Sequence, residues 1–273
     1  MKSMKKIMKI LLITVIFLMT VGCGETKTTK NTTVEATKEE GKNVNLTISA
    51  AASLKDSMEE LKTTYESENK GTTITYNFAG SGSLQKQIEE GAEVDLFISA
   101  APKQMNGLKD KGLIAEETNV NLLGNNMVLV VPKDSKLEIS EFKDLTKDTL
   151  KKIALGEPSS VPVGQYAEEV FKNLGILEQV KQKAIYAKDV KEVLTWTESS
   201  NVDAGIVYET DAKTSDKVKV IATAPVDKYT KIIYPAAVLK ASKNFEEAKS
   251  FLDFLKGDKA KETFEKYGFT FMP

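Results

Sequence analysis

The chain has no histidine, no arginine and only one cysteine, so all 38 of its basic side chains are lysines. Without imidazole groups there are no histidine metal ligands, no histidine general bases and no Ser-His-Asp triad. Without guanidinium groups no bidentate clamp can hold a carboxylate or a phosphate. A single cysteine excludes an intramolecular disulfide and any metal site built from several thiolates. We therefore expect no directly coordinated metal and no cofactor.

The charge balance argues against a polyanionic partner. The 38 basic side chains face 39 acidic ones, which leaves no basic field of the kind that attracts nucleic acid. We expect no nucleic-acid partner. With 273 residues, of which 41% are hydrophobic, the chain is long enough for one large domain or two smaller ones with cores.

The N-terminus has the pattern of a secretory signal peptide. Several lysines precede an apolar run over residues 10–21, which is too short to span a bilayer comfortably. The run ends in Val21-Gly22-Cys23-Gly24, which resembles the processing site of bacterial lipoproteins, where the cysteine becomes the lipidated first residue. We predict a signal peptide at 1–22, lipidation of Cys23 and an extracytoplasmic protein held on the cell membrane by its lipid.

A change of composition follows the cysteine. Residues 25–43 are dominated by Thr, Lys, Glu and Asn, contain no aromatic residue, and have Val34 as their only branched aliphatic residue. Such a segment cannot bury enough apolar surface to order itself. We interpret residues 23–43 as the lipidated cysteine and a flexible tether, and about twenty flexible residues have a root-mean-square reach of roughly 25 Å.

From residue 44 onward, strand-like runs alternate with segments whose apolar residues recur every three or four positions, for example between residues 54 and 65. Strands that alternate with helices predict an α/β protein with largely parallel sheets. Ser53 stands at the expected start of the first helix, and Asp56 follows three residues later, which is the pattern of a capping box. The strand-like runs are 44–49, 73–78, 95–99, 126–132, 152–155, 184–186, 204–208 and 231–240.

Two of these runs are longer and more β-like, and they divide the alternation into blocks of the size of a small lobe. We predict that residues 44–124 together with about 231–273 form lobe 1 and that residues 125–230 form lobe 2. Each lobe would be a mainly parallel sheet flanked by helices. In open α/β sheets, ligands bind beyond the carboxyl ends of the strands, so two facing lobes would place these ends on one cleft.

Neutral hydrogen-bond donors stand at these strand ends. Helix starts leave backbone N–H groups without partners, and the helix dipole favours an anion there. A shell made only of donors suits a fully deprotonated tetrahedral oxyanion, because a proton on the ligand would lack an acceptor at a cost of roughly 1–3 kcal/mol. The strand-to-helix turns concerned carry Ser53 and Ser81 in the first block, and Val163, Val190 and Tyr208 in the second.

The motifs that carry these residues also carry a family resemblance. In order along residues 45–271 they are "AAASLKD", "FAGSGSLQKQIEEGAEVDLFISA", "LLGNNMVLVVP", "GEPSSVPVGQYA", "KDV", "GIVY" and "FEKYGF". Together they resemble the molybdate-binding proteins of bacterial ABC importers. The resemblance implies a two-lobed type II periplasmic-binding-protein fold that closes over molybdate or tungstate, held by uncharged donors alone.

Carried over motif by motif, the resemblance implies a ligand shell made of the Ser53 and Ser81 hydroxyls, the backbone at Val163 and Val190, and the Tyr208 hydroxyl. It also implies an ABC permease as partner, and we expect a monomer. The family usually has more serine in the second turn, where this chain has Gly80 and Gly82. The side-chain contact could therefore come from Ser81 or Ser83.

Two alternatives stay open. A binding protein for another tetrahedral oxyanion, such as sulfate, would share the fold but have a different pocket. Ser-x-x-Lys occurs at Ser83–Lys86 and at Ser140–Lys143, as in penicillin-recognising hydrolases. The Lys-Thr-Gly and Ser-Asp-Asn partner motifs of such enzymes are absent from the sequence, so we predict a binding protein and not an enzyme.

Overall fold

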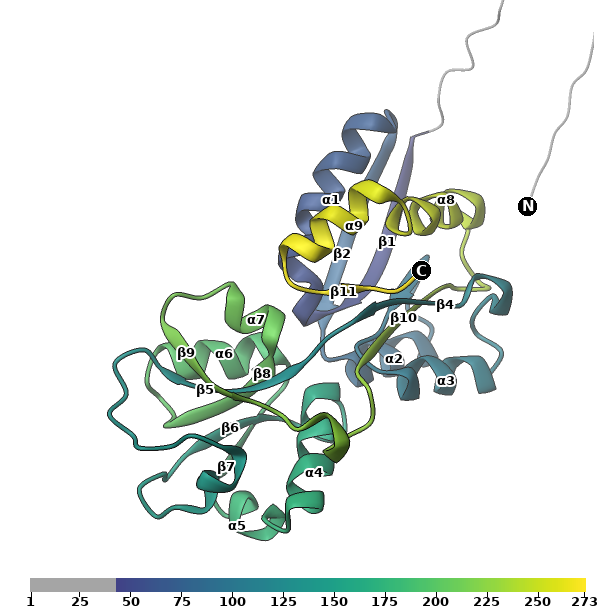
Figure 1. Ribbon diagram of the computed structural model, residues 1–273. Helices are drawn as coiled ribbons and strands as arrows, with labels where there is room; N and C mark the ends of the chain where they lie inside the picture. The colour runs from purple at the N-terminus through teal and green to yellow at the C-terminus, as the bar shows by residue number, and fades with distance from the viewer. Residues whose placement is uncertain (1–42) are drawn as a thin grey trace, which may run out of the picture. The chain divides into compact units, whose positions relative to one another are not determined.

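The computed structural model describes residues 43–273, and Gly41–Pro273 form one compact unit (Figure 1). The predicted signal peptide at 1–22, the lipidation of Cys23 and all but the last residue of the predicted tether lie outside the described residues. None of the helices in the described range is long and apolar enough to cross a membrane.

A six-stranded sheet is built from both ends of this range. Its strand order is β11-β4-β10-β3-β1-β2. The strands are β1 (Val44–Ala51), β2 (Thr72–Ala79), β3 (Leu96–Ile98), β4 (Val120–Gly124), β10 (Ile233–Val238) and β11 (Thr270–Phe271).

The middle of the chain forms a five-stranded sheet of order β7-β6-β8-β5-β9. Its strands are β5 (Met127–Pro132), β6 (Ile153–Gly156), β7 (Ala184–Ala187), β8 (Ala204–Tyr208) and β9 (Val218–Thr223). The chain passes from the first sheet to the second between β4 and β5, and it returns between β9 and β10 (Figure 1).

Helices connect the strands of both sheets, as the alternating pattern predicts. Those of the first sheet are α1 (Lys55–Glu68), α2 (Ser81–Glu89), α3 (Pro102–Asp110), α8 (Phe245–Leu255) and α9 (Asp258–Lys266). Those of the second sheet are α4 (Pro162–Leu174), α5 (Leu177–Lys181), α6 (Val190–Glu198) and α7 (Glu209–Lys213). Short 3-10 turns are η1 (Ala52–Leu54), η2 (Glu116–Thr118), η3 (Phe142–Thr146) and η4 (Val226–Lys228).

Both sheets are mixed, and most strands of each sheet run in one direction, in agreement with the predicted mainly parallel sheets. In the first sheet β1 is parallel to β2 and β3, but β10 is antiparallel to β3 and β4. In the second sheet β6 is parallel to β7 and β8, but β5 is antiparallel to β8 and β9. The antiparallel pairs arise because the strands that carry the chain between the sheets enter each sheet against the direction of its β-α-β units.

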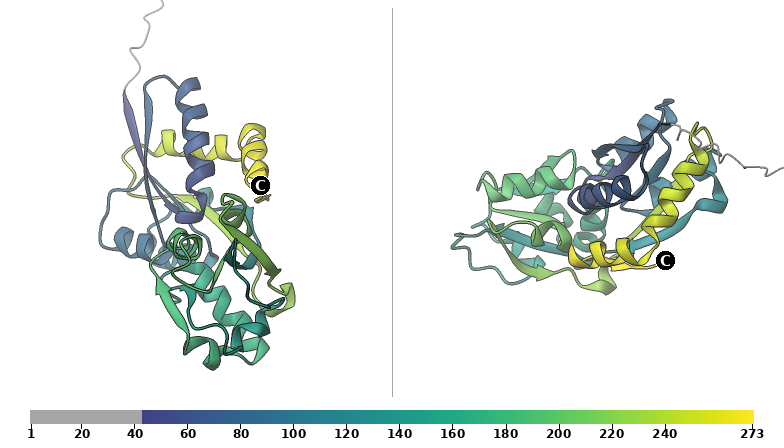
Figure 2. Two further views of the ribbon diagram at one scale, coloured as in Figure 1. Left: turned by 90° about the vertical axis from the view of Figure 1, so that its left-hand side faces the viewer. Right: turned by 90° about the horizontal axis from the view of Figure 1, so that it is seen from above.

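The last helices pack on the first sheet, beside α1 (Figures 1 and 2). Tyr65 of α1 meets the edges of Phe251 and Phe254 of α8, with ring centroids 4.8 and 5.1 Å apart. Such edge-to-face pairs add to the stabilisation from burial. This packing returns the C-terminal segment to the sheet with which the described range begins.

Candidate functional site

A small cavity with an empty volume of about 190 Å³ lies where helix starts of the two sheets meet. All five residues that the sequence singles out for the ligand line it, and they are at most 5% exposed. The full lining is Ala51, Ala52, Ser53, Ala79, Gly80, Ser81, Ala100, Val161, Pro162, Val163, Val190 and Tyr208.

Each of the five lies at or shortly after the carboxyl end of a strand. Ser53 lies in the 3-10 turn after β1, and Ser81 is the first residue of α2, after β2. On the second sheet, Val163 is the second residue of α4, Val190 opens α6, and Tyr208 ends β8 directly before α7. N–H groups in the first turn of a helix have no acceptor within the helix, and the helix dipole makes this end favourable for an anion. The topology therefore gathers donors from distant turns at one point.

The structure shows that the capping box predicted for Ser53 is wrong. The 3-10 turn separates Ser53 from α1, whose N-cap is Leu54 and has no side-chain cap. The Ser53 hydroxyl lies 2.9 Å from Tyr234 Oη instead, and the Asp56 carboxylate pairs with Lys191. Ser53 thus lines the cavity with a hydroxyl that the helix does not use.

Ser81 is fully buried, and its Oγ accepts a hydrogen bond of 3.0 Å from the backbone N–H of Ala100. Because this bond uses a lone pair, the hydroxyl proton of Ser81 stays available to donate. Ser83, the alternative residue in the same turn, is not among the residues that line the cavity. The geometry therefore favours Ser81 for the side-chain contact.

Val163 and Val190 line the cavity and are buried, and each lies in the first turn of its helix. A Cβ placed on Gly164 would overlap the carbonyl of Gly156, so α4 starts directly against the end of β6. At the start of α6, the Asp189 side chain accepts a hydrogen bond of 2.9 Å from the N–H of Glu192. Asp189 is therefore the N-cap of α6, and it is not among the residues that line the cavity.

Tyr208 is 1% exposed, and among the described residues its Oη has no hydrogen-bond partner. Burial raises the pKa of this hydroxyl well above its ordinary value, so it is a neutral donor at any physiological pH. An unpaired buried hydroxyl is unfavourable, which makes it a group that gains from a ligand in the cavity.

Two glycines allow the turns to approach one another. The N–H of Gly82, in α2, donates a 2.8 Å hydrogen bond to the carbonyl of Ser160, which precedes α4. A Cβ on Gly82 would lie 2.7 Å from the Ser160 Cα, and one on Gly80 would lie 2.8 Å from the Lys188 carbonyl oxygen. Neither spacing is sterically allowed, so a larger residue at either position would push the two sheets apart.

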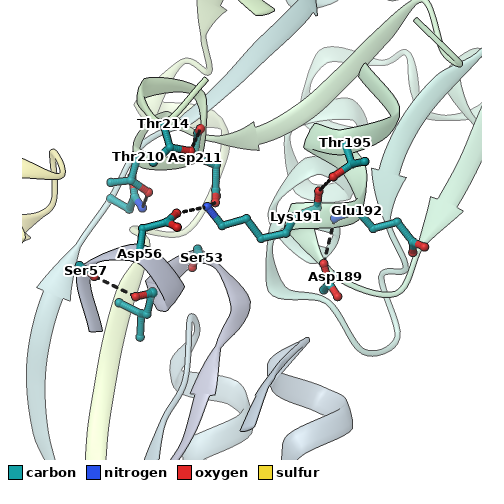
Figure 3. A network of polar contacts seen from close by, with 12 residues as sticks. Ser53, Asp56, Ser57, Asp189, Lys191, Glu192, Thr195, Thr210, Asp211 and Thr214 are labelled. Carbon is teal, nitrogen blue, oxygen red and sulfur yellow. Dashed lines mark hydrogen bonds and ion pairs between the residues drawn. The ribbon is translucent and has the colours of Figure 1, made fainter. Parts of the chain in front are cut away.

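Two sets of polar contacts near the cavity were not predicted from the sequence. Asn125 donates to Tyr234 Oη, which contacts Ser53, so these residues support the site without lining it. Lys191 of α6 reaches across to Asp56 of α1 and also pairs with the buried Asp211 (Figure 3). The partners in these contacts are far apart in the sequence, so no local pattern predicted them. Only Asn125 lies within one of the motifs quoted above, "LLGNNMVLVVP".

A larger cavity lies elsewhere, near the start of β1, with an empty volume of about 1260 Å³. The most buried charged group there, Asp95, already accepts hydrogen bonds from the backbone N–H of Thr47 and from the Ser242 hydroxyl. None of the five predicted ligand residues lines it. Donor chemistry, and not size, therefore selects the small cavity as the candidate site.

The small cavity is uncharged. None of the described residues that line it is ionisable apart from Tyr208, which is neutral. Within residues 43–273 no group of three or more His, Cys, Asp or Glu side chains could hold a metal ion. The arrangement can bind a small group that only accepts hydrogen bonds, and it offers no base or nucleophile pair for hydrolysis.

Two mixed sheets flanked by helices, with donors converging between them, define a two-lobed type II periplasmic-binding-protein fold and so a solute-binding protein. The sequence profile of the bacterial extracellular solute-binding proteins matches residues 46–270, and the chain belongs to this family. This confirms the predicted fold family and the prediction of a binding protein that is not an enzyme.

Individual relatives agree with this assignment. The chain is 43% identical over 254 residues to YvgL of Bacillus subtilis, whose name describes an ABC transporter substrate-binding lipoprotein; the match covers 93% of this chain and 94% of YvgL. It is 41% identical over 244 residues to the molybdate-binding protein ModA of Escherichia coli, covering 86% of this chain and 91% of ModA.

Solved structures show the same fold. The substrate-binding domain of a molybdenum ABC transporter, as it is named, from Clostridium difficile is 45% identical with a TM-score of 0.65, covering 84% of this chain and 100% of that one. The periplasmic molybdate-binding protein of Azotobacter vinelandii has a TM-score of 0.75 at 21% identity, covering 84% and 100%.

Proposed function

We propose that this chain captures molybdate or tungstate in the small cavity and delivers it to an ABC permease. The observation that carries the proposal is the convergence of Ser53, Ser81, Val163, Val190 and Tyr208 on one buried, uncharged cavity. Three of them offer hydroxyl groups, and the backbone N–H groups at the helix starts add further donors.

Selectivity for a fully deprotonated oxyanion follows from this donor set. Every oxygen of molybdate or tungstate accepts hydrogen bonds, so each donor finds a partner. Hydrogen phosphate carries a proton that needs an acceptor, and leaving that proton unpaired costs roughly 1–3 kcal/mol. Sulfate has the same charge and shape in a smaller radius, which makes it the second candidate and an arm of the test.

The names of the relatives support the choice of ligand. Several relatives, including the Escherichia coli protein and that of Haemophilus influenzae at 36% identity over 230 residues, are molybdate-binding proteins by name. The sulfate-binding protein SubI of Mycobacterium tuberculosis is 15% identical and supports only the fold. No cofactor takes part in the proposed binding.

Capture would proceed by closure of two lobes, residues 44–124 with about 231–273 and residues 125–230. The distribution of strands between the two sheets supports this division. Closure removes water from the anion and strengthens each donor, and a ligand that touches both lobes favours the closed state. Removal of residues 1–22, lipidation of Cys23 and a tether to residue 43 would hold a monomer outside the cell, beside its permease.

Calorimetry of the chain from Gly41, which begins the compact unit, tests the proposal with molybdate, tungstate, sulfate and phosphate. We expect tight one-to-one binding of molybdate and tungstate and at least 100-fold weaker binding of the other two, about 2.7 kcal/mol. Tighter binding of sulfate would show that the chain binds a different oxyanion, while the proposed site would stand. Absence of binding to all four would reject the proposed function.

A further inference from the structure

The direction of the Ser53 hydroxyl proton depends on the groups around it. Its Oγ lies 2.9 Å from Oη of Tyr234, and either oxygen could be the donor in this pair alone. Tyr234 lies in β10, is fully buried and does not line the cavity. The direction of the hydrogen bond therefore depends on what else Tyr234 contacts.

Asn125 settles this direction. The N–H of Asn126 donates to Asn125 Oδ1 at 2.8 Å, which identifies the carbonyl end of the amide. The Nδ2 group then lies 2.9 Å from Thr210 Oγ1 and 3.2 Å from Tyr234 Oη. An amide NH₂ group donates two protons and accepts none, so both contacts are donations by Asn125.

Tyr234 therefore accepts from Asn125, and its own proton needs an acceptor. Ser53 Oγ is the hydrogen-bonding partner that remains for Tyr234 among the described residues. A buried hydroxyl proton without an acceptor is unfavourable, so Tyr234 donates to Ser53. The proton of Ser53 then has no use within the protein and is left for the cavity.

Asn125, Tyr234 and Thr210 lie close to the connections between the two sheets. Asn125 lies between β4 and β5, where the chain passes from the first sheet to the second, and Tyr234 lies near the start of β10, directly after the chain returns. Thr210, the other group that Asn125 contacts, lies in α7 of the second sheet. These hydrogen bonds thus connect the first crossing and the strand that follows the second crossing to Ser53, which lines the cavity.

We infer that Asn125 and Tyr234 are positioning residues that fix Ser53 as a donor toward the bound oxyanion. The inference rests on the proposed function and deepens it. It assigns part of the discrimination against protonated oxyanions to residues that do not contact the ligand. Below, the Asn125–Tyr234–Ser53 chain denotes these hydrogen bonds.

Asn125→Asp should reverse the chain, because a carboxylate accepts hydrogen bonds and donates none. Tyr234 would turn its proton toward residue 125, Ser53 would donate to Tyr234, and lone pairs of Ser53 would face the anion. We expect the affinity for molybdate to fall by about 10- to 150-fold, which is the range for the loss of one hydrogen bond to a charged group.

A double variant separates this reversal from the added negative charge. Asn125→Asp with Tyr234→Phe keeps the charge but removes the hydroxyl that competes for the proton of Ser53. We expect the double variant to bind molybdate about ten-fold more tightly than Asn125→Asp alone. Repulsion by the new charge would instead leave the two equally weak, which would overturn the inference.

A second cycle does not depend on the carboxylate and covers the case that Asn125→Asp fails to fold. Tyr234→Phe is measured in the wild-type chain and in Ser53→Ala. We expect Tyr234→Phe to weaken molybdate binding and to narrow the preference for molybdate over hydrogen phosphate, but to change neither in Ser53→Ala. Equal effects in both backgrounds would show that Tyr234 does not act through Ser53.

All affinities are measured by calorimetry on the chain from Gly41, with thermal unfolding of each variant to show that it is folded. A wild-type chain that binds no oxyanion overturns the proposed function and, with it, this inference. A wild-type chain that binds molybdate while both cycles give additive effects overturns only the role of the Asn125–Tyr234–Ser53 chain.

Discussion

Lys191 Nζ lies 2.6 Å from Asp56 Oδ2, so one ion pair joins α6 of the second sheet to α1 of the first (Figure 3). The same ammonium lies 3.2 Å from Oδ1 of Asp211, whose side chain is fully buried. Burial raises the pKa of Asp211 to about 6, and Lys191 limits the rise. Lys191 therefore both bridges the sheets and compensates a buried carboxylate beside the candidate site.

Lys191→Met should reduce the free energy of unfolding by about 3–5 kcal/mol at pH 7.5, because it leaves the buried carboxylate of Asp211 without a counter-charge. At pH 5 the loss should be smaller, since Asp211 is then largely protonated and needs no partner. Urea unfolding at the two pH values measures both effects. The exposed Lys188 provides the control, and Lys188→Met should change little at either pH. An equal loss for the two variants would contradict the role of Lys191.

As the pH rises from 4 to 6, the free energy of unfolding of the wild-type chain should decrease relative to that of Asp211→Asn. The folded-state pKa of Asp211, about 6, lies above its ordinary value of 3.8, so the native state binds more protons in this window. A difference of about two pH units corresponds to roughly 3 kcal/mol. The difference in unfolding free energy between the two proteins, measured at several pH values, shows whether the wild-type chain loses stability as the pH rises. A constant difference from pH 4 to pH 7.5 would rule out this titration.

Tyr208→Phe should weaken molybdate binding while leaving the ligand-free protein as stable as before or slightly more so. The hydroxyl has no partner among the described residues, so its removal relieves an unpaired buried group. Binding should weaken by about 10- to 150-fold, the loss of one hydrogen bond to a charged ligand. Tyr166→Phe is the matched control, because its buried hydroxyl is also unpaired but does not line the cavity. If both variants bind molybdate as tightly as the wild type does, the Tyr208 hydroxyl does not contact the anion.

Ser81→Ala and Ser83→Ala test which serine of the second turn contacts the anion. Ser81 lines the cavity with a proton free to donate, and Ser83 does not line it. Calorimetry should show a loss of about 10- to 150-fold for Ser81→Ala and less than about twofold for Ser83→Ala. The opposite ranking would move the contact to Ser83.

Gly82→Ala should hinder closure of the cavity without harming the first sheet. The added Cβ would meet the backbone at Ser160, which cannot move aside as a side chain can. Overpacking of about 1–3 kcal/mol would weaken binding roughly 5- to 150-fold. In Gly107→Ala, the control within α3, the Cβ would meet only the mobile amide of Gln85, and affinity should be kept. Equal affinities for the two variants would show that Gly82 does not limit closure.

The sequence alone predicted most elements and five of the residues that line the candidate cavity, because each of them lies in a short segment with a recognisable local pattern. Strand runs and helical periodicity marked β1, α1, β2 and α2 within a few residues of their observed bounds. Ser53, Ser81, Val163, Val190 and Tyr208 stand in ordered motifs at strand ends, where α/β topology collects ligand groups.

Local patterns failed where partners are distant in sequence. Ser53 and Asp56 had the spacing of a capping box, but their partners are Tyr234 and Lys191, which belong to other elements. The direction of β5 and β10 was also missed, since a run of apolar residues does not report whether its neighbour is parallel.

The sequence by itself indicated the class of chemistry, because the chain has no histidine or arginine and its strand ends carry serine, tyrosine and free N–H groups, which are neutral donors. The tertiary structure alone decided how those donors are aimed. Contacts across more than a hundred residues, from Asn125 to Tyr234 and from Lys191 to Asp56, set the proton of Ser53 and join the two sheets. Such contacts depend on the meeting of surfaces from separate elements, which no local pattern of residues encodes.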